Sequence, residues 1–441
     1  MTPRPQLEPK LRARCCLCSM LALAGCASEY VGEDPPIDEL HYPIGIAVDP
    51  AHRALLVASS NFDLAYNRGV VHSVDLERVD AQIAADGGRA AAPIEDALRG
   101  GAMVASFAGE IGFDPGTRRA FVPNRLTSTL VELELAGSGD GLTVSCGDSA
   151  APAPDCTEGD RVVQLAGGDA YSTLVTPGAA GARIFVGGLS GGTVSVADDF
   201  YDRDGASRLT LPLSIDTELY RASGLALLGA TSTAPELLLV AGEFRPASGD
   251  ARPTGAYLRI YATSLGPDQT LGSVPLVVAN RALDARGLVL STDQRTAFVI
   301  LRSPDSVAAL DLSAGQTGQP LFRTTIMRSI GRTPTAIALD PDAVEGEQLL
   351  VACYSDDAVY ALDASTLEVR TVLDDVGTGP THFAVDAAGG RAYVTLFGDD
   401  TVAVLALDRP GHRGLEKIAT VGKPRPKPQP SFSLDPWNLF R

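Results

Sequence analysis

Short apolar runs separated by turn residues recur along this chain, and the clearest set lies near its C-terminal end. Phe383–Val385, Ala392–Leu396 and Val402–Leu407 are separated first by Asp-Ala-Ala-Gly-Gly and then by Gly-Asp-Asp. Runs of this length, rich in Val, Tyr and Phe and bounded by Gly and Asp, predict antiparallel strands joined by tight turns. Three such strands cannot bury both faces of their sheet, so the unit requires neighbours of its own kind.

Six further units with this pattern precede the last one. They begin at Pro43, Gly109, Tyr171, Gly224, Gly287 and Thr335. A fourth apolar run follows most of the units: Val162–Leu165, Leu209–Leu213, Leu276–Val278, Leu321–Ile326, Val369–Leu373 and Ile418–Val421. In the first unit the expected fourth strand is Met103–Phe107, and a helical pattern is confined to Asp80–Leu98. The pattern predicts an all-β fold, a seven-bladed β-propeller with four-stranded antiparallel blades.

The sequence motif at the start of a unit is itself repeated. Pro-x-x-(Ile/Phe)-Ala-(Val/Leu)-Asp starts at Pro43, Pro334 and Pro380, and Val-(Ala/Thr) and Val-x-x-Leu-Asp follow it. These repeats resemble the YVTN-type seven-bladed propeller family of YncE-like proteins, over roughly residues 43–422. The resemblance implies a blade and no particular activity, because propellers carry unrelated functions.

The first residues of the chain read as a targeting segment. A basic region ends at Arg14, and the apolar stretch after it is too short to span a bilayer as a helix. Leu23-Ala24-Gly25-Cys26 resembles the bacterial lipobox, which implies cleavage before Cys26 and lipid on that residue. Ala27 at the next position implies sorting to the outer membrane, facing either the periplasm or the cell surface. An ordinary signal peptide cut elsewhere, or a cytosolic start, is the alternative.

The predicted organisation therefore has four parts. A signal peptide (1–25) is followed by the lipidated cysteine and a polar tether (26–42), the propeller (43–422) and a Pro-rich tail (423–441). The tail is either a docking peptide or a disordered end.

Charge and cysteine content limit the partners, disulfides and cofactors that we expect for this chain. A formal net charge of −18 argues against nucleic acid as a partner. The partners we expect are the membrane, through the lipid, and an envelope protein or an anionic small ligand, with the protein itself a monomer. Export permits disulfides, and Cys146 and Cys156 flank a loop-like insert where a bridge would contribute on the order of 2–3 kcal/mol. Cys353 lies in an apolar run and reads as buried, and no Cys or His spacing indicates a metal or another cofactor.

In a propeller, the loops that enter the inner strands share one face with the loops between second and third strands. The entrance residues with chemistry to offer are His41, Glu110, Tyr171, Arg221, Arg286, Arg332 and His382, and the outer loops add arginines that include Arg125 and Arg302. Arg221, Arg286 and Arg332 come from successive units and together would bind a carboxylate or phosphate. Alternatively, each of them is solvated or pairs with a nearby acid such as Asp284.

We expect no assembled catalytic set. The recurring Asp49, Asp114, Asp340 and Asp386 follow the inner strands and read as turn residues whose carboxylates bond backbone amides. The sequence therefore favours a lipid-anchored binding protein with its site at the axial face. The second hypothesis is a hydrolase of the lactonase type that uses Glu110, His41 and His382, since seven-bladed lactonases share the architecture. A structural role in an envelope assembly is the third.

Overall fold

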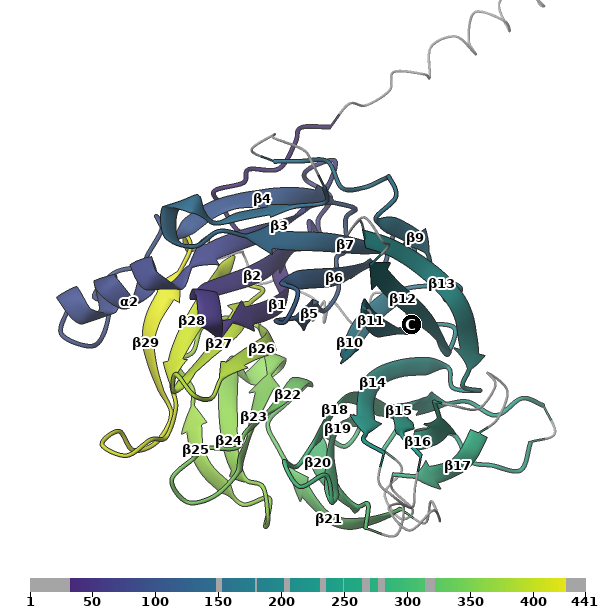
Figure 1. The fold of residues 1–441 in the computed structure, drawn as a ribbon. Helices are drawn as coiled ribbons and strands as arrows, with labels where there is room; N and C mark the ends of the chain where they lie inside the picture. The colour runs from purple at the N-terminus through teal and green to yellow at the C-terminus, as the bar shows by residue number, and fades with distance from the viewer. Residues whose placement is uncertain are drawn as a thin grey trace, which may run out of the picture.

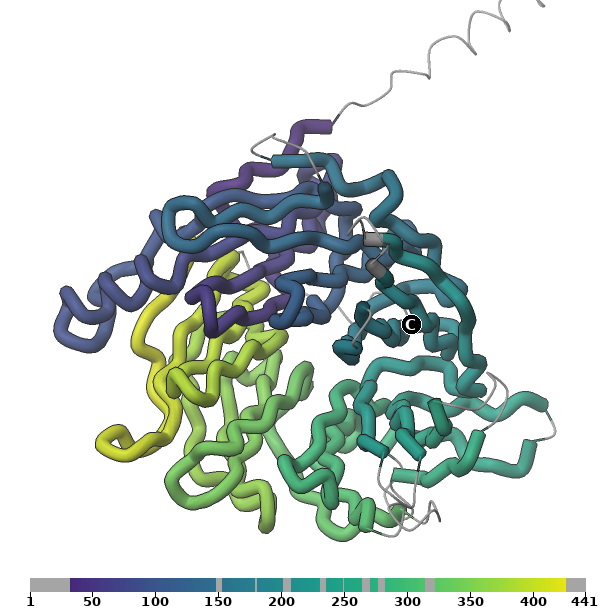
Figure 2. Tube along the Cα trace, in the orientation of Figure 1, coloured from purple at the N-terminus to yellow at the C-terminus, as the bar shows by residue number. Residues whose placement is uncertain are grey.

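The chain folds into seven antiparallel sheets arranged in a ring around a central axis (Figure 1). This computed structural model describes residues 32–147, 153–178, 181–201, 207–230, 235–248, 250–263, 270–276, 282–313 and 322–425. The strands of each sheet are consecutive in sequence, as in propeller blades. The tube in Figure 2 shows the first blade, in purple and blue, beside the last, in yellow. The predicted seven-bladed β-propeller is confirmed.

The blades succeed one another from Pro43 to Val421. Blade 1 has β1 (Pro43–Asp49), β2 (Ala54–Ser59), β3 (Gly69–Asp75) and β4 (Leu98–Val104); blade 2 has β5 (Gly112–Asp114), β6 (Arg119–Asn124), β7 (Thr129–Ala136), β8 (Thr143–Ser145) and β9 (Val162–Gln164); blade 3 has β10 (Ala170–Gly178), β11 (Gly181–Gly188), β12 (Thr193–Tyr201) and β13 (Ser207–Asp216). Blade 4 has β14 (Arg221–Leu228), β15 (Leu237–Phe244), β16 (Gly255–Ala262) and β17 (Thr270–Pro275); blade 5 has β18 (Asp284–Leu290), β19 (Thr296–Arg302), β20 (Ser306–Asp311) and β21 (Arg323–Ser329). Blade 6 has β22 (Pro334–Asp340), β23 (Gln348–Cys353), β24 (Ala358–Asp363) and β25 (Val369–Leu373); blade 7 has β26 (Pro380–Asp386), β27 (Arg391–Leu396), β28 (Thr401–Ala406) and β29 (Glu416–Val421).

Two expectations for blade 1 were wrong in their bounds. Its fourth strand is β4 (Leu98–Val104) and not Met103–Phe107, because the pairing with β3 sets the register and places Gly101 opposite His72. The helix α2 spans Leu76–Ala85 and therefore begins and ends earlier than Asp80–Leu98. Asp75 caps it by accepting hydrogen bonds from the backbone amides of its first turn. None of the helices in the described ranges has both the length and the apolarity that crossing a bilayer requires.

Each pair of neighbouring blades shares a cluster of buried apolar side chains. Leu56 of blade 1 belongs to one cluster with Leu133 of blade 2, and Leu55 of blade 1 belongs to another with Val404 of blade 7. Alternate residues of a strand point to opposite faces, so a blade buries one set against each neighbour. Full burial of one such side chain contributes about 1.5–3 kcal/mol. This shared burial closes the ring between the last blade and the first.

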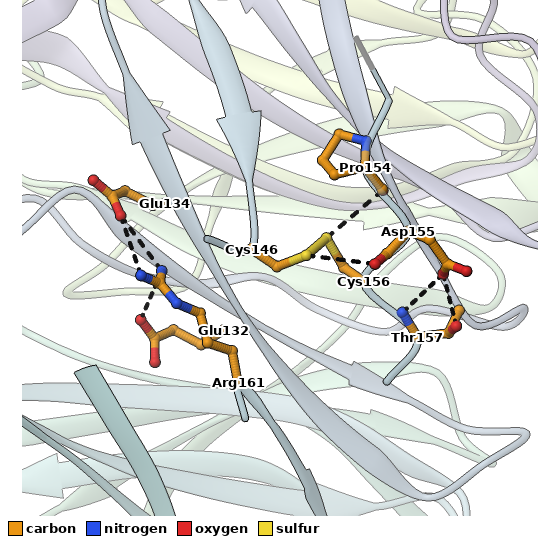
Figure 3. The surroundings of a disulfide bond; sticks show 8 residues. All are labelled: Glu132, Glu134, Cys146, Pro154, Asp155, Cys156, Thr157 and Arg161. Carbon is orange, nitrogen blue, oxygen red and sulfur yellow. Dashed lines mark hydrogen bonds and ion pairs between the residues drawn. A yellow bond between two sulfur atoms is a disulfide. The ribbon is translucent and has the colours of Figure 1, made fainter. Parts of the chain in front are cut away.

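Blade 2 departs from four strands because two short segments share its outer edge. β8 pairs with the end of β7 at Glu134–Ala136, and β9 pairs with its beginning at Thr129–Val131. A disulfide joins Cys146 to Cys156 in the insertion between β8 and β9, with 5.7 Å between the Cα atoms. Figure 3 shows this bridge close to Arg161, which forms ion pairs with Glu132 and Glu134.

Insertions from blades 1 and 2 cover the outer edges of blades 7 and 1, respectively. In blade 1, Ile94 donates its amide to the carbonyl of Thr420 and accepts from the amide of Gly422, which extends blade 7 beyond β29. In blade 2, the carbonyl of Pro154 and the amide of Cys156 bond Met103 on β4 of blade 1. Covering an edge removes unpaired backbone groups from solvent. Blades 7, 1 and 2 are thus connected at their outer edges as well as through their shared apolar clusters.

Ion pairs join neighbouring blades on the face opposite the axial entrances. Arg118 of blade 2 donates to Asp49 of blade 1 at 2.8 Å, and Arg53 of blade 1 donates to Asp386 of blade 7 at 3.1 Å. Arg409 of blade 7 binds Asp340 of blade 6 through two hydrogen bonds of 2.8 and 2.9 Å. Two of these aspartates also accept turn amides, Asp386 from Gly389 at 2.9 Å and Asp340 from Asp342 at 3.3 Å, whereas the Asp49 side chain makes no such capping bond. Asp340 and Asp386 therefore serve as turn residues and as links between blades, while Asp49 links blades without bonding a turn amide.

The described part of the predicted tether, from residue 32 to residue 42, lies against the propeller. His72 in β3 donates its Nδ1 hydrogen to the carbonyl of Ile37 at 3.1 Å, and Leu40 is buried between blades 1 and 7. Glu39 forms ion pairs with Lys423 and Arg425, which follow β29. The predicted signal peptide, Cys26 and residues 27–31 lie outside the described residues, as does the tail beyond Arg425.

Candidate functional site at the axial mouth

The inner strands share an irregularity where they begin, at the end of the axis that we call the axial mouth. The pairing of inner and second strands shifts register at this point in β1, β10, β14, β18, β22 and β26. In four of these strands the extra residue is Tyr171, Ser223, Arg286 or Thr335, and in β26 the shift spans Thr381 and His382. A bulge redirects one side chain out of the sheet's alternation. The register shift thus singles out equivalent residues in different blades.

Three of the predicted site residues meet at the axial mouth. The hydroxyl of Tyr171 lies 2.9 Å from Nε2 of His382, and Oε1 of Glu110 lies 3.1 Å from the same nitrogen. Tyr171 comes from blade 3 and His382 from blade 7, while Glu110 precedes β5 of blade 2. Tyr171 and His382 are buried, whereas 30% of the Glu110 side chain is exposed. The cluster is therefore reached from the side of Glu110.

Backbone contacts fix this cluster in place. The amide of Glu110 donates to the carbonyl of Tyr171 at 2.8 Å. The amide of His382 donates to Oγ1 of Thr395, and that hydroxyl donates to the carbonyl of Ile44 in blade 1. Blades 2 and 3 are thus tied together on one side of the cluster and blades 7 and 1 on the other. Such anchoring holds reactive side chains in a defined geometry.

A cavity of about 170 Å³ extends from the cluster along the axis. Its lining includes Glu110 and His382 together with the hydroxyl residues Ser172, Ser223 and Thr335. Nδ1 of His382 and Oγ of Ser172 are buried and have no hydrogen-bond partner in the described part of the chain. Buried polar atoms in proteins nearly always have partners. The cavity can hold water molecules or a small polar group that would satisfy them.

The three arginines predicted to share the mouth do not all lie together. Arg221 and Arg286 are buried and both approach Asp284, at 3.4 and 2.7 Å respectively. Arg332 is 73% exposed at its side chain and pairs with Asp356 at 2.6 Å. All three arginines therefore pair with a nearby acid, as the alternative interpretation expected. Asp284 is that acid for Arg221 and Arg286.

Two arginines outside the predicted set, Arg125 and Arg302, act electrostatically on the cluster together with Arg286. Burial and the carboxylate of Glu110 raise the pKa of Tyr171 well above its usual value, while the positive charges of Arg125, Arg286 and Arg302 act in the opposite direction. Arg125 and Arg302 lie where the second strands of blades 2 and 5 end, and both are buried. The sequence placed them in outer loops and did not select them. Their shared position after the second strand is the signal that would have found them.

His41 does not join this cluster. Its Nε2 lies 2.8 Å from Asp63 and its Nδ1 lies 3.7 Å from the buried Asp400. Of the groups named for a hydrolase, the structure brings together Glu110 and His382 and places His41 elsewhere. No group of three His, Cys, Asp or Glu side chains suited to a metal ion occurs in the ranges that the structure describes.

Comparisons with known proteins agree on the fold. No protein-family model matches the chain, and no curated protein matches it in sequence. Among solved structures, the chain is similar to the Kuenenia stuttgartiensis hydrazine synthase, with a TM-score of 0.54 and 13% identity over 86% of this chain and 98% of that one. It is similar to the β-propeller domain of Myceliophteria thermophila Cps50 (Swd1), with a TM-score of 0.53 and 8% identity over 82% and 96% of the two chains. A candidate 6-phosphogluconolactonase from Bacteroides fragilis gives 0.52 and 12% identity over 87% and 95%.

Identities this low establish the architecture alone, and these proteins differ widely in function. Fold and site together define the class: a seven-bladed β-propeller with a buried polar cluster at its axial mouth.

Proposed function

We propose that the protein is an exported, lipid-anchored propeller of the YncE-like kind that binds a small anionic ligand at the axial mouth. The charges acting on the Tyr171 hydroxyl carry this proposal. Three buried arginines, Arg125, Arg286 and Arg302, act on this hydroxyl together with the carboxylate of Glu110. Two of them have an acidic partner, Asp169 for Arg125 at 2.5 Å and Asp284 for Arg286 at 2.7 Å. An anion bound there would gain charge-assisted hydrogen bonds in a region shielded from water.

The site also has donors and acceptors for uncharged groups of a ligand. Glu110 accepts hydrogen bonds, and the cavity beyond it is lined by hydroxyl groups. We therefore expect a compact carboxylate or phosphate that also carries hydroxyl or carbonyl groups. A cavity of about 170 Å³ accommodates only a small portion of such a molecule, so the remainder would lie in the mouth.

Calorimetry with inorganic phosphate, citrate and gluconate tests this binding. The variant Arg286→Gln/Arg302→Gln should lose the affinity that the wild-type chain shows for at least one of these anions. Arg295→Gln is the matched control, because Arg295 is 70% exposed and lies 4.0 Å from Asp293, outside the axial cluster. Affinity that survives the double substitution would refute the site.

A second candidate function is hydrolysis of a lactone or related ester, supported by the position of His382 between a phenol and a carboxylate. A histidine with such neighbours can accept a proton from water and pass it on to the leaving oxygen. Turnover of sugar lactones should then fall by about 10²–10⁴-fold in His382→Gln, the usual contribution of a general base. Binding without turnover in the wild-type chain would leave the first function standing alone.

The anchor is proposed from the lipobox resemblance at Cys26. The chain expressed in a Gram-negative host should partition with outer membranes, and Cys26→Ser should release it into the soluble periplasmic fraction. Incorporation of labelled fatty acid into the wild-type chain and not into Cys26→Ser is the direct measurement. Membrane association that persists in this variant would contradict the anchor.

A further inference from the structure

Five aromatic side chains form a continuous surface next to the axial mouth, which we call the aromatic surface. They come from blades 6, 7, 1 and 2 and from the segment before β1: Tyr354, Phe397, Tyr42, Phe62 and Phe107. The ring of Phe397 lies 4.7 Å from that of Tyr42 and 5.3 Å from that of Phe62. Phe62 continues to Phe107 at 5.6 Å, and Tyr354 contacts Phe397 at 6.2 Å.

This surface is only partly covered by the described residues. All of its rings except that of Phe397 are half-buried, and the neighbouring Leu64 and Leu126 are 55% and 62% exposed. Tyr171 packs in the same apolar cluster as Phe397, so the aromatic surface adjoins the axial site. Apolar patches of this kind on a soluble domain mark sites of interaction.

The end of the described chain leads towards this surface. After β29 the chain crosses the loop between β27 and β28, where the amide of Arg425 donates to the carbonyl of Asp399 at 2.9 Å. Asp399 follows Phe397 by two residues. The chain has therefore moved from the outer strand of blade 7 to the loop that carries Phe397, and residues 426–441 continue from that point.

The chemistry of residues 426–441 fits an aromatic surface. Proline alternates with other residues from Pro424 to Pro430, which favours an extended polyproline II conformation. Such segments bind in grooves lined with aromatic side chains. The segment holds two basic residues and one acidic residue, opposite in balance to the chain as a whole. Sixteen residues at about 3.1 Å each span about 50 Å, which is long enough to contact several of the five rings, whose neighbouring centroids lie 4.7 to 6.2 Å apart.

We propose that residues 426–441 dock on the aromatic surface of their own chain. This inference goes beyond the proposed function, because it depends on the aromatic side chains and not on the arginines. Its failure would leave anion binding untouched.

Trp437 offers a direct test, because it is the single tryptophan of the chain and lies in the proposed docking segment. In the full mature chain, Trp437 should emit at shorter wavelength than in a free peptide of residues 423–441. Its quenching by acrylamide should be severalfold slower than in that peptide. Equal emission and equal quenching in protein and peptide would overturn the proposal.

Substitutions on the aromatic surface locate the docking site. Leu126→Ser/Phe107→Ser should restore fast quenching of Trp437, and Leu126→Ser alone, at a side chain that is 62% exposed, should do so in part without endangering the fold. Val369→Ser/Val372→Ser on β25 is the matched control, since these side chains are 46% and 44% exposed on the outer strand of blade 6. Protection that is kept in the first variant, or lost in the control, would overturn the assignment.

Quenching of Trp437 also shows whether the segment docks on its own chain or on a second copy of it. Protection of Trp437 that disappears on dilution, together with dimers in sedimentation equilibrium, would mean that the segment docks on a second copy and would refute docking within one chain. Protection that is independent of concentration is the expected result.

Discussion

The hydroxyl of Tyr171 lies 2.9 Å from Nε2 of His382, although 211 positions separate the two residues in sequence. The contact spans the axis between blade 3 and blade 7 and joins Glu110 of blade 2 through the same nitrogen. It is the contact on which the proposed binding site depends.

Removing the Tyr171 hydroxyl should weaken anion binding more than it weakens the fold. In Tyr171→Phe, His382 loses the hydrogen bond that holds its ring beside the cavity, which corresponds to about 0.5–1.5 kcal/mol, or roughly 2–12-fold in affinity. Calorimetric titration of the variant with the anion that binds the wild-type chain measures this loss. Tyr257→Phe is the control, because the Tyr257 hydroxyl donates to the carbonyl of Pro253 in blade 4, away from the mouth. Equal affinities in the two variants would contradict the role of Tyr171.

The buried carboxylate of Asp340 depends on an arginine from the next blade. Asp340 is fully buried, and Arg409 provides two hydrogen bonds to it. Arg409→Met should lower the free energy of unfolding by about 3 kcal/mol, because the substitution leaves a buried charge without its partner. Denaturant titration gives the value. Arg413→Met, at a side chain that is 64% exposed and 3.6 Å from Glu345, should change it by less than about 0.5 kcal/mol.

Stability should fall in mild acid because of His72. Burial lowers the pKa of His72 to about 4, and its two ring nitrogens are occupied by Ile37 and Ser59. An unfolded histidine titrates near 6.5, so the unfolded state binds the proton first as the pH falls. The contribution of neutral His72 is complete above about pH 6.5 and is lost between 6.5 and 4, a change of about 3 kcal/mol.

Comparing His72→Gln with the wild-type chain isolates this effect. The difference between their unfolding free energies should shrink as the pH is lowered from 7 to 4, because only the wild-type chain loses the histidine contribution. His52→Gln, at a side chain that is 44% exposed, should follow the wild-type pH dependence. Parallel curves for wild-type and His72→Gln would contradict the prediction.

The Cys146–Cys156 bridge should stabilise the blade 2 insertion. It closes a loop with a sequence separation of 10, for which the chain-entropy model gives about 2–3 kcal/mol. Cys146→Ser/Cys156→Ser should therefore unfold at lower denaturant concentration, and so should the wild-type chain under reductant. Reductant should have no further effect on the double variant, because Cys353 is a free thiol and the variant lacks the bridge that reductant would break. An unchanged midpoint in the variant would show that the bridge constrains nothing.

Much of the architecture was predictable from local pattern. The Pro-x-x-Ile-Ala-Val-Asp motif at Pro43 predicts a strand that ends in a turn at Asp49, and the structure has β1 over Pro43–Asp49. Elements outside the repeat were harder to place. The glycines of β4 carry no alternation, and β8 is three residues long, so only pairing with β3 and β7 defines them.

The candidate site shows which features follow from the local sequence and which depend on the tertiary structure. Apolar alternation and turn residues are local properties of the chain, and they determined that it forms repeated sheets needing like neighbours. The approach of Glu110, Tyr171 and His382 required the ring to close, since packing between blades decides which entrances face each other. The bulges explain why Arg286 takes an axial position while Arg221 and Arg332, two and three residues before the corresponding Ser223 and Thr335, do not. A register shift arises from pairing with a second strand, so it belongs to the tertiary structure and leaves no mark in a single strand's sequence.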